Sequence, residues 1–176
     1  LSSGYTQRDA AKLIVEKNLW GIDIDERAWQ LSHFALLMKA RQYNRQALNT
    51  ISFTHLYPVR DTRGWSRRLL DYIASGDSAM RDDLDTLKAA YAEAETLGSI
   101  IRPPAVDSEK LVEHWRGDIL GQTHHDIEGR ILQQQVEMHF LPVLLQHHAL
   151  EQKYHVVVTN PPYMGSSGMN NLLSSY

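Results

Sequence analysis

Four consecutive residues near the end of the sequence could together bind an amino group on a planar ring: Asn160-Pro161-Pro162-Tyr163. They follow the β-branched run 154–159, which is typical of a buried parallel strand. Consecutive prolines end strand pairing and keep the backbone extended, so carbonyl groups are left pointing into a cleft. The Asn160 side-chain oxygen and the Pro161 carbonyl could then accept both hydrogens of one amino group and leave its lone pair directed at an electrophile. Tyr163 offers an aromatic face for stacking a planar group. An ordinary Asn-Pro turn is the alternative, but it does not explain these features arriving together.

A second candidate is Asp23, at the end of a predicted strand over 19–24. Ligands of open parallel sheets bind beyond the carboxyl ends of the strands. There a carboxylate could accept two hydrogen bonds from a ribose diol, and Ile24 could pack against an adenine ring. Asp23 could instead join Asp25 in capping the next helix. The residues alone leave both interpretations open.

The sequence around these candidates predicts strands that alternate with helices. Apolar periodicity and capping residues predict helices over 6–17, 26–43, 61–97 (broken near Ser75-Gly76), 108–120 and from 125 onward, with Pro142 kinking or restarting the last one. Strands are predicted over 19–24, 50–57 and 154–159. Strands separated by helices predict an α/β fold.

Composition narrows the class of protein. The chain has 176 residues, 43% of them hydrophobic and 22% charged, which fits one globular domain and not a disordered chain. With no cysteine there are no disulfides, zinc thiolates or cysteine nucleophiles. A net charge of -3 argues against a domain whose main role is to bind the phosphate backbone of nucleic acids. Without a long apolar run or a signal-peptide pattern, we expect a cytoplasmic protein. Because the chain opens with Leu1, we expect an excerpt of a longer protein.

Two of these motifs resemble those of a known enzyme family. The run 157–163 resembles motif IV of amino-group methyltransferases that use S-adenosylmethionine, and 21–25 resembles their second motif. The chain resembles the BREX-type PglX adenine-specific DNA methyltransferases and, more broadly, the type IIG restriction-modification methyltransferases. Leu97-Gly98-Ser99-Ile100-Ile101 and Met164-Gly165 also resemble that group.

The resemblance implies a partial Rossmann-like methyltransferase fold, with sheet portions in 1–58 and 150–176 and a mainly helical insertion in 59–149. It implies methyl transfer from S-adenosylmethionine to N6 of an adenine flipped out of double-stranded DNA, in phage defence or restriction-modification. Asn160 and Pro161, followed by Pro162, would hold the amino group while Tyr163 stacks on the base. Asp23 would bind the cofactor ribose and Ile24 its adenine. No metal or membrane is implied, and further defence-system subunits are candidate partners.

Several expectations qualify that resemblance. The family's Gly-rich first motif precedes the Gly-Ile-Asp strand, whereas here Gly4 is the only glycine before it, so weak cofactor binding is expected of the isolated chain.

Glutamine-N5 methyltransferases share Asn-Pro-Pro-Tyr, but with a shorter path between the two motifs. A helical interaction module without activity is a further alternative, which an apolar patch on 61–150 would support. No convincing acid marks the third motif, for which His55 and Asp61 are candidates.

The remaining clusters have ordinary explanations. The adjacent pairs His124-His125 and His147-His148 suit one metal ion poorly, because neighbouring residues point to different helix faces. The basic residues Arg63, Arg67 and Arg68 are flanked by acids and predict a solvated helix face.

Overall fold

The computed structural model describes residues 4–119 and 126–159. Two strands, β1 (Trp20–Asp23) and β2 (His55–Pro58), pair in parallel, with Trp20 opposite His55 and Asp23 opposite Pro58. The connection between them contains α2 (Glu26–Tyr43) and the short α3 (Ala47–Thr50). The predicted strand–turn–helix unit at 19–43 is therefore confirmed, and the predicted second strand forms at the end of its segment.

Local capping determines where the first helices begin. Before β1, α1 (Gln7–Leu13) starts at Thr6, whose hydroxyl accepts the Asp9 N–H at 3.1 Å, and a π-helical turn, η1 (Ile14–Asn18), follows. The Asp25 carboxylate accepts the N–H groups of Arg27 and Ala28 at 2.7 and 3.2 Å. These bonds satisfy backbone donors that a helix N-terminus leaves unpaired, so α2 begins at Glu26.

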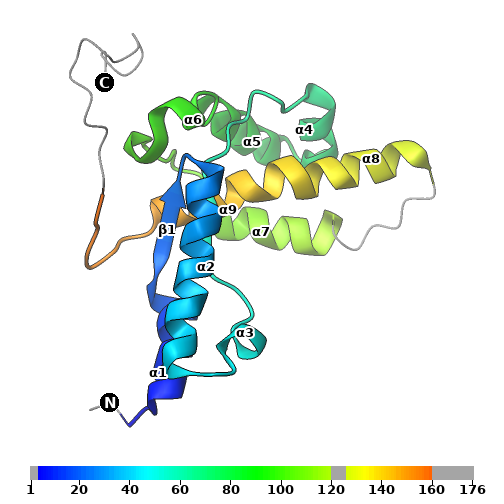
Figure 1. The fold of residues 1–176 in the computed structure, drawn as a ribbon. Coiled ribbons are helices and arrows are strands. Elements are labelled where there is room, and N and C mark those ends of the chain that lie inside the picture. The colour runs from blue at the N-terminus through cyan, green and yellow to red at the C-terminus, as the bar shows by residue number, and fades with distance from the viewer. Residues whose placement is uncertain (1–3, 120–125, 160–176) are drawn as a thin grey trace, which may run out of the picture.

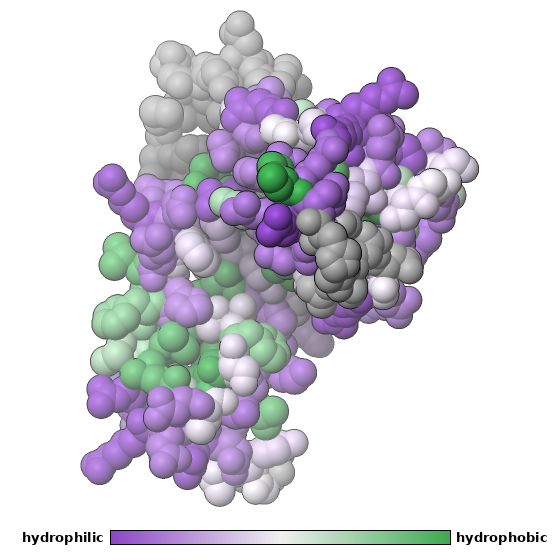
Figure 2. All heavy atoms as spheres, turned by 90° about the vertical axis from the view of Figure 1, so that its right-hand side faces the viewer, coloured by the Kyte–Doolittle hydropathy of each residue, from purple (hydrophilic) through white to green (hydrophobic). Residues whose placement is uncertain are grey.

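One side of α2 packs on the sheet. The Trp29 indole N–H donates to the Leu56 carbonyl at 2.8 Å, and His33 Nδ1 lies 3.0 Å from the Thr54 hydroxyl. The other side carries exposed apolar residues, with Leu31 and Phe34 at 69% and 63% exposure. Figure 2 shows apolar surface gathered over the part of the molecule that contains α2 and α3.

The remaining described elements form a helical layer beside the sheet (Figure 1). In order they are α4 (Arg67–Ala74), α5 (Ser78–Ala90), α6 (Ala94–Leu97), the 3-10 turn η2 (Gly98–Ile100), α7 (Ser108–His114), η3 (Trp115–Ile119), α8 (Ile127–Gln135), η4 (Val136–Phe140) and α9 (Leu141–Glu151). The main hydrophobic core lies within this layer and includes the fully buried Tyr91, Phe140 and Leu144. Most apolar burial, and therefore most of the hydrophobic stabilisation, belongs to the helical layer and not to the small sheet.

Pro142 does not break the last helical segment. It occupies the first turn of α9, where its missing N–H costs little, and the π-helical η4 precedes it directly. The five-residue π turn accommodates the change in backbone hydrogen bonding at this junction.

The predicted strand over 154–159 is wrong for the residues described. The segment has no strand partner, and Val156, Val157 and Val158 are 79%, 74% and 91% exposed. A parallel strand needs a neighbour that pairs its backbone, and among the described residues this segment pairs with the outer edge of neither β1 nor β2. What the structure shows is a helix-rich chain with a small parallel sheet, and the complete Rossmann-like sheet is not seen in it. Over residues 4–119 and 126–159, none of the helices combines the length and apolar character needed to cross a bilayer.

Candidate functional site at the carboxyl end of β1

Asp23 occupies the exposed carboxyl end of β1. Its backbone carbonyl accepts the Val59 N–H at 2.8 Å, which ties the ends of the two strands together. Its Oδ1 accepts the Asp25 N–H at 2.9 Å. Within the described part of the chain, Oδ2 has no partner, so this carboxylate retains an acceptor that faces solvent. Asp25 alone caps α2, and Asp23 fixes the turn before it.

Ile24 is the apolar neighbour of that carboxylate. Its side chain is 51% exposed and lies against Gly98 of the helical layer, far away in the sequence. The contact is so close that a Cβ built on Gly98 would lie 2.5 Å from Ile24 Cδ1. The resemblance of residues 97–101 to the family did not predict that Gly98 contacts Ile24. The positive φ of 58° at Gly98 marks it, but that is visible only in the structure.

The cavity beneath Asp23 is too small to be a ligand site. It encloses about 70 Å³ between the sheet and α2, and its lining residues include Gly21, Asp23, Trp29 and Tyr57. Small-molecule sites usually measure a few hundred Å³, so an adenosyl group would have to bind outside the strand ends. Burial raises the pKa of Tyr57, with a further contribution from Tyr154, so its phenol stays neutral in this wall. A wider hollow at Met38 and Arg41 lies toward the opposite end of α2.

The four motif residues Asn160, Pro161, Pro162 and Tyr163 lie outside the described residues. The segment leading toward them is described as far as Thr159. Its Tyr154 hydroxyl donates to the Ala149 carbonyl at 2.6 Å, and the Tyr154 ring lies 6.2 Å from that of Trp20. Tyr154, six residues before the motif, therefore lies beside the first residue of β1.

Neither candidate for the third motif is a free acid beside Asp23. His55 begins β2, stacks on Trp20 with ring centres 3.7 Å apart, and has Nε2 3.0 Å from the Glu16 carbonyl. Burial lowers the pKa of His55, and the nearby His148 and Lys17 lower it further against that backbone hydrogen bond. Asp61 does follow β2, but its carboxylate is bonded to the Arg63 guanidinium at 2.6 Å.

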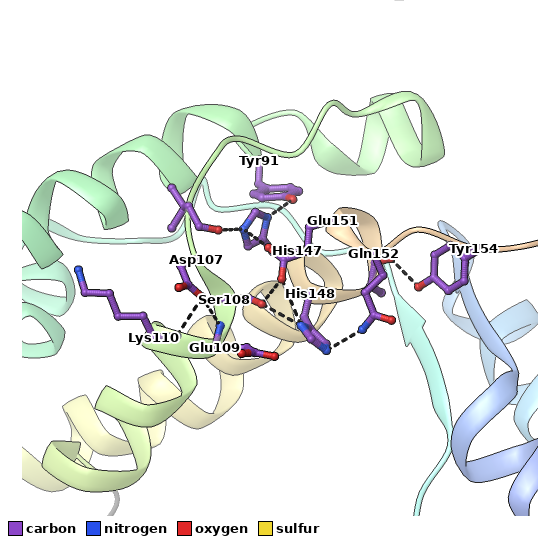
Figure 3. A network of polar contacts seen from close by, with 12 residues as sticks. Tyr91, Asp107, Ser108, Glu109, Lys110, His147, His148, Glu151, Gln152 and Tyr154 are labelled. Atoms are coloured by element: carbon purple, nitrogen blue, oxygen red, sulfur yellow. Dashed lines mark hydrogen bonds and ion pairs between the residues drawn. The ribbon is translucent and has the colours of Figure 1, made fainter.

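Two adjacent histidines belong to a structural network (Figure 3). The fully buried His147 lies 2.8 Å from the Tyr91 hydroxyl through Nδ1 and 2.8 Å from the Val106 carbonyl through Nε2. His148 instead contacts Ser108 at 2.8 Å. Both rings also lie near the Glu151 carboxylate, His147 at 3.4 Å and His148 at 3.3 Å, yet the described residues contain no group of side chains that could hold a metal ion. The other pair, His124 and His125, lies outside the described residues. This network joins α9 to the loops and helices around it.

The basic residues of α4 and the turn before it are paired with acids. Arg63 lies against Asp61 and Glu95. Arg67 pairs with Asp71 one turn further along α4, and Arg68 pairs with Glu128 of α8. The prediction that these basic residues form a solvated helix face flanked by acids is confirmed. Elsewhere in the layer, three apolar side chains are exposed at helical spacing, a feature that the interaction-module alternative predicts: Ile127, Ile131 and Met138.

Comparison with known proteins shows the family to which the chain belongs. The family model of the Eco57I restriction-modification methylase matches residues 17–176. The chain is 34% identical to an adenine-specific methyltransferase, BrxX, of Escherichia coli O9:H4 (strain HS), over 98% of this chain and 16% of the relative. It is 32% identical to an adenine-specific methyltransferase, PglX, of Lacticaseibacillus casei (strain Zhang), over 99% of this chain and 14% of the relative. The chain thus spans about a sixth or less of the length of these curated relatives, and it belongs to the Eco57I restriction-modification methylase family.

Proposed function

We propose that this chain supplies cofactor-binding and base-binding residues of an S-adenosylmethionine-dependent DNA methyltransferase that modifies adenine N6. The observation that carries the proposal is the exposed Asp23 carboxylate at the end of a parallel strand, followed by the exposed Ile24, in a member of this methylase family. The proposal includes action on double-stranded DNA in the cytoplasm, in phage defence or restriction-modification. The names of the two relatives, both adenine-specific methyltransferases, support it.

The described residues fit the adenosyl half of the cofactor. The outward oxygen of Asp23 can accept hydrogen bonds from a ribose diol, and the exposed Ile24 side chain can pack on a flat heterocycle. Asp25 keeps the turn rigid by capping α2, so the carboxylate is held in place before a ligand arrives. Such preorganisation reduces the entropy lost on binding. The cofactor, when bound, supplies an electrophilic methyl group.

The base would be held by the motif after Thr159. The Asn160 side-chain oxygen and the Pro161 carbonyl would accept the two amino hydrogens of a flipped adenine, and Tyr163 would stack on its ring. Pro162 would keep the backbone extended so that these acceptors converge. The residues would act by positioning the amino nitrogen and stabilising developing charge in a pocket without water.

A methylation assay on the complete protein tests the proposal with a matched pair of variants. Asp23→Asn keeps the oxygen that fixes the turn but removes the charge. Hydrogen bonds to a charged group contribute about 1.5–3 kcal/mol, so we expect cofactor binding to weaken about 10- to 100-fold. Asp25→Asn is the control, because asparagine caps helices about as well as aspartate. Asn160→Ala should abolish transfer to DNA.

The product identifies the reaction. Digestion of the modified DNA and mass spectrometry should detect N6-methyladenine. Methylation of a glutamine in protein, with none in DNA, would support the N5-glutamine alternative. A complete protein that binds S-adenosylhomocysteine equally well with Asp23→Asn would refute the role of Asp23.

A further inference from the structure

The contact between Ile24 and Gly98 joins the helical layer to the proposed cofactor site. Gly98 follows α6, and α6 lies with the helical layer near the upper end of β1 (Figure 1). Packing between β1 and the η2 turn confirms that the two segments are neighbours. A segment of the insertion thus reaches the residue that follows Asp23.

Gly98 sits in a backbone conformation that excludes other residues. Its φ of 58° and ψ of -129° lie in a region that is essentially accessible only to glycine. An added Cβ would also lie 2.5 Å from Ile24 Cδ1 and 3.1 Å from Ile24 Cγ1. Both backbone geometry and space therefore require glycine where the turn meets Ile24.

The turn is anchored on both sides in the main core. Ala94, four residues before Gly98, is fully buried, and its carbonyl accepts the Gly98 N–H. Ile101, three residues after, is 5% exposed and belongs to the same core cluster. Because packed interiors deform little, a turn held in this way presents a fixed surface to Ile24.

The helical layer also holds the end of β2. Gln146 of α9 is fully buried, and its amide accepts the Arg60 N–H at 2.6 Å and donates to the Arg60 carbonyl at 3.3 Å. Val59 in turn donates to the Asp23 carbonyl at 2.8 Å. The helical layer therefore supports the ends of the two strands through α9. It supports Ile24 through the Gly98 turn.

We infer that Gly98 is a positioning residue for Ile24, through which the helical layer sets the affinity for the adenine-bearing cofactor. The inference rests on the proposed function and adds a role for the insertion. The Gly98 turn restricts where the Ile24 side chain can lie, and a side chain that is already ordered loses less entropy when a ligand packs on it. A methyl group at position 98 displaces both the turn and Ile24.

Binding of S-adenosylhomocysteine to the complete protein, measured by calorimetry, tests this role. For Gly98→Ala we expect a Kd about tenfold higher, with the Kd for DNA unchanged. The KM for S-adenosylmethionine should rise while kcat and the KM for DNA stay the same. Gly64→Ala is the matched control, because no atom lies within 4 Å of a Cβ built there. Its Kd should equal that of the parent.

A double variant separates positioning from general damage. Ile24→Val removes the Cδ1 atom that the new methyl group would meet, so its effect should not add to that of Gly98→Ala. If Gly98→Ala does not fold, Ile101→Val loosens the turn by one buried methyl group and should raise the Kd about threefold. The inference would be overturned if the folded variant, Gly98→Ala or Ile101→Val, bound S-adenosylhomocysteine with an unchanged Kd. It would also be overturned if the effects of Ile24→Val and Gly98→Ala were fully additive in the double variant. Failure of the parent protein to bind S-adenosylhomocysteine would instead refute the proposed function.

Discussion

Replacing Gln146 by leucine should loosen the proposed site from a distance. Gln146 is fully buried in α9, and its amide pairs with both the N–H and the carbonyl of Arg60, at 2.6 and 3.3 Å. Leucine is similar in size but offers no polar atom. The substitution therefore leaves a backbone donor and a backbone acceptor unpaired just after β2.

The expected cost follows from those two bonds. An unsatisfied buried polar group costs about 1–3 kcal/mol, and Arg60 is only half-buried, so water can replace part of what is lost. The apolar side chain of leucine also offsets part of the cost. We therefore expect Gln146→Leu to lower the free energy of local opening by about 2 kcal/mol.

Hydrogen–deuterium exchange measures this locally. A loss of about 2 kcal/mol corresponds to exchange about 30-fold faster at the Arg60 amide. Gln134→Leu is the control, because Gln134 is exposed on α8 and its substitution should change exchange little. If the peptide covering 56–62 exchanged equally fast in Gln146→Leu and in the parent protein, Gln146 would not support the strand end.

Two further predictions concern the buried histidine network and the aromatic stack. Tyr91→Phe removes the hydrogen-bond partner of Nδ1 of the buried His147, so thermal unfolding should report a loss of about 1–3 kcal/mol. Burial raises the pKa of Tyr91, so its contribution to stability is present below about pH 10 and is lost as pH rises beyond it; the variant should show a smaller decrease over that range, and an equal decrease would contradict the assignment. Burial lowers the pKa of His55, so its contribution to stability is present above about pH 6.5 and is lost as pH falls further. His55→Phe preserves an aromatic ring beside Trp20 and should flatten the acid decrease in urea-unfolding midpoints, whereas an unchanged slope would exclude His55 as its source.

Elements that depend on near neighbours along the chain could be predicted from the amino-acid sequence. Thr6 and Asp25 cap their helices through hydrogen bonds that reach only two or three residues along the chain. Apolar periodicity predicted α2, and the same reasoning placed Asp23 at a strand end. The family was also identified from sequence, because motifs are local strings of residues.

Contacts between segments that are distant in the chain became known from the three-dimensional structure. The run 154–159 has the composition of a buried strand, yet a strand also needs a neighbour to pair its backbone, and no described strand pairs with it. The contact of Gly98 with Ile24 and the pairing of Gln146 with Arg60 join residues that are far apart in the chain. Neither periodicity nor capping records such contacts, because both describe backbone geometry within a few residues. The support that the helical layer gives to Asp23 and Ile24 therefore follows from packing and could not be predicted from local sequence patterns.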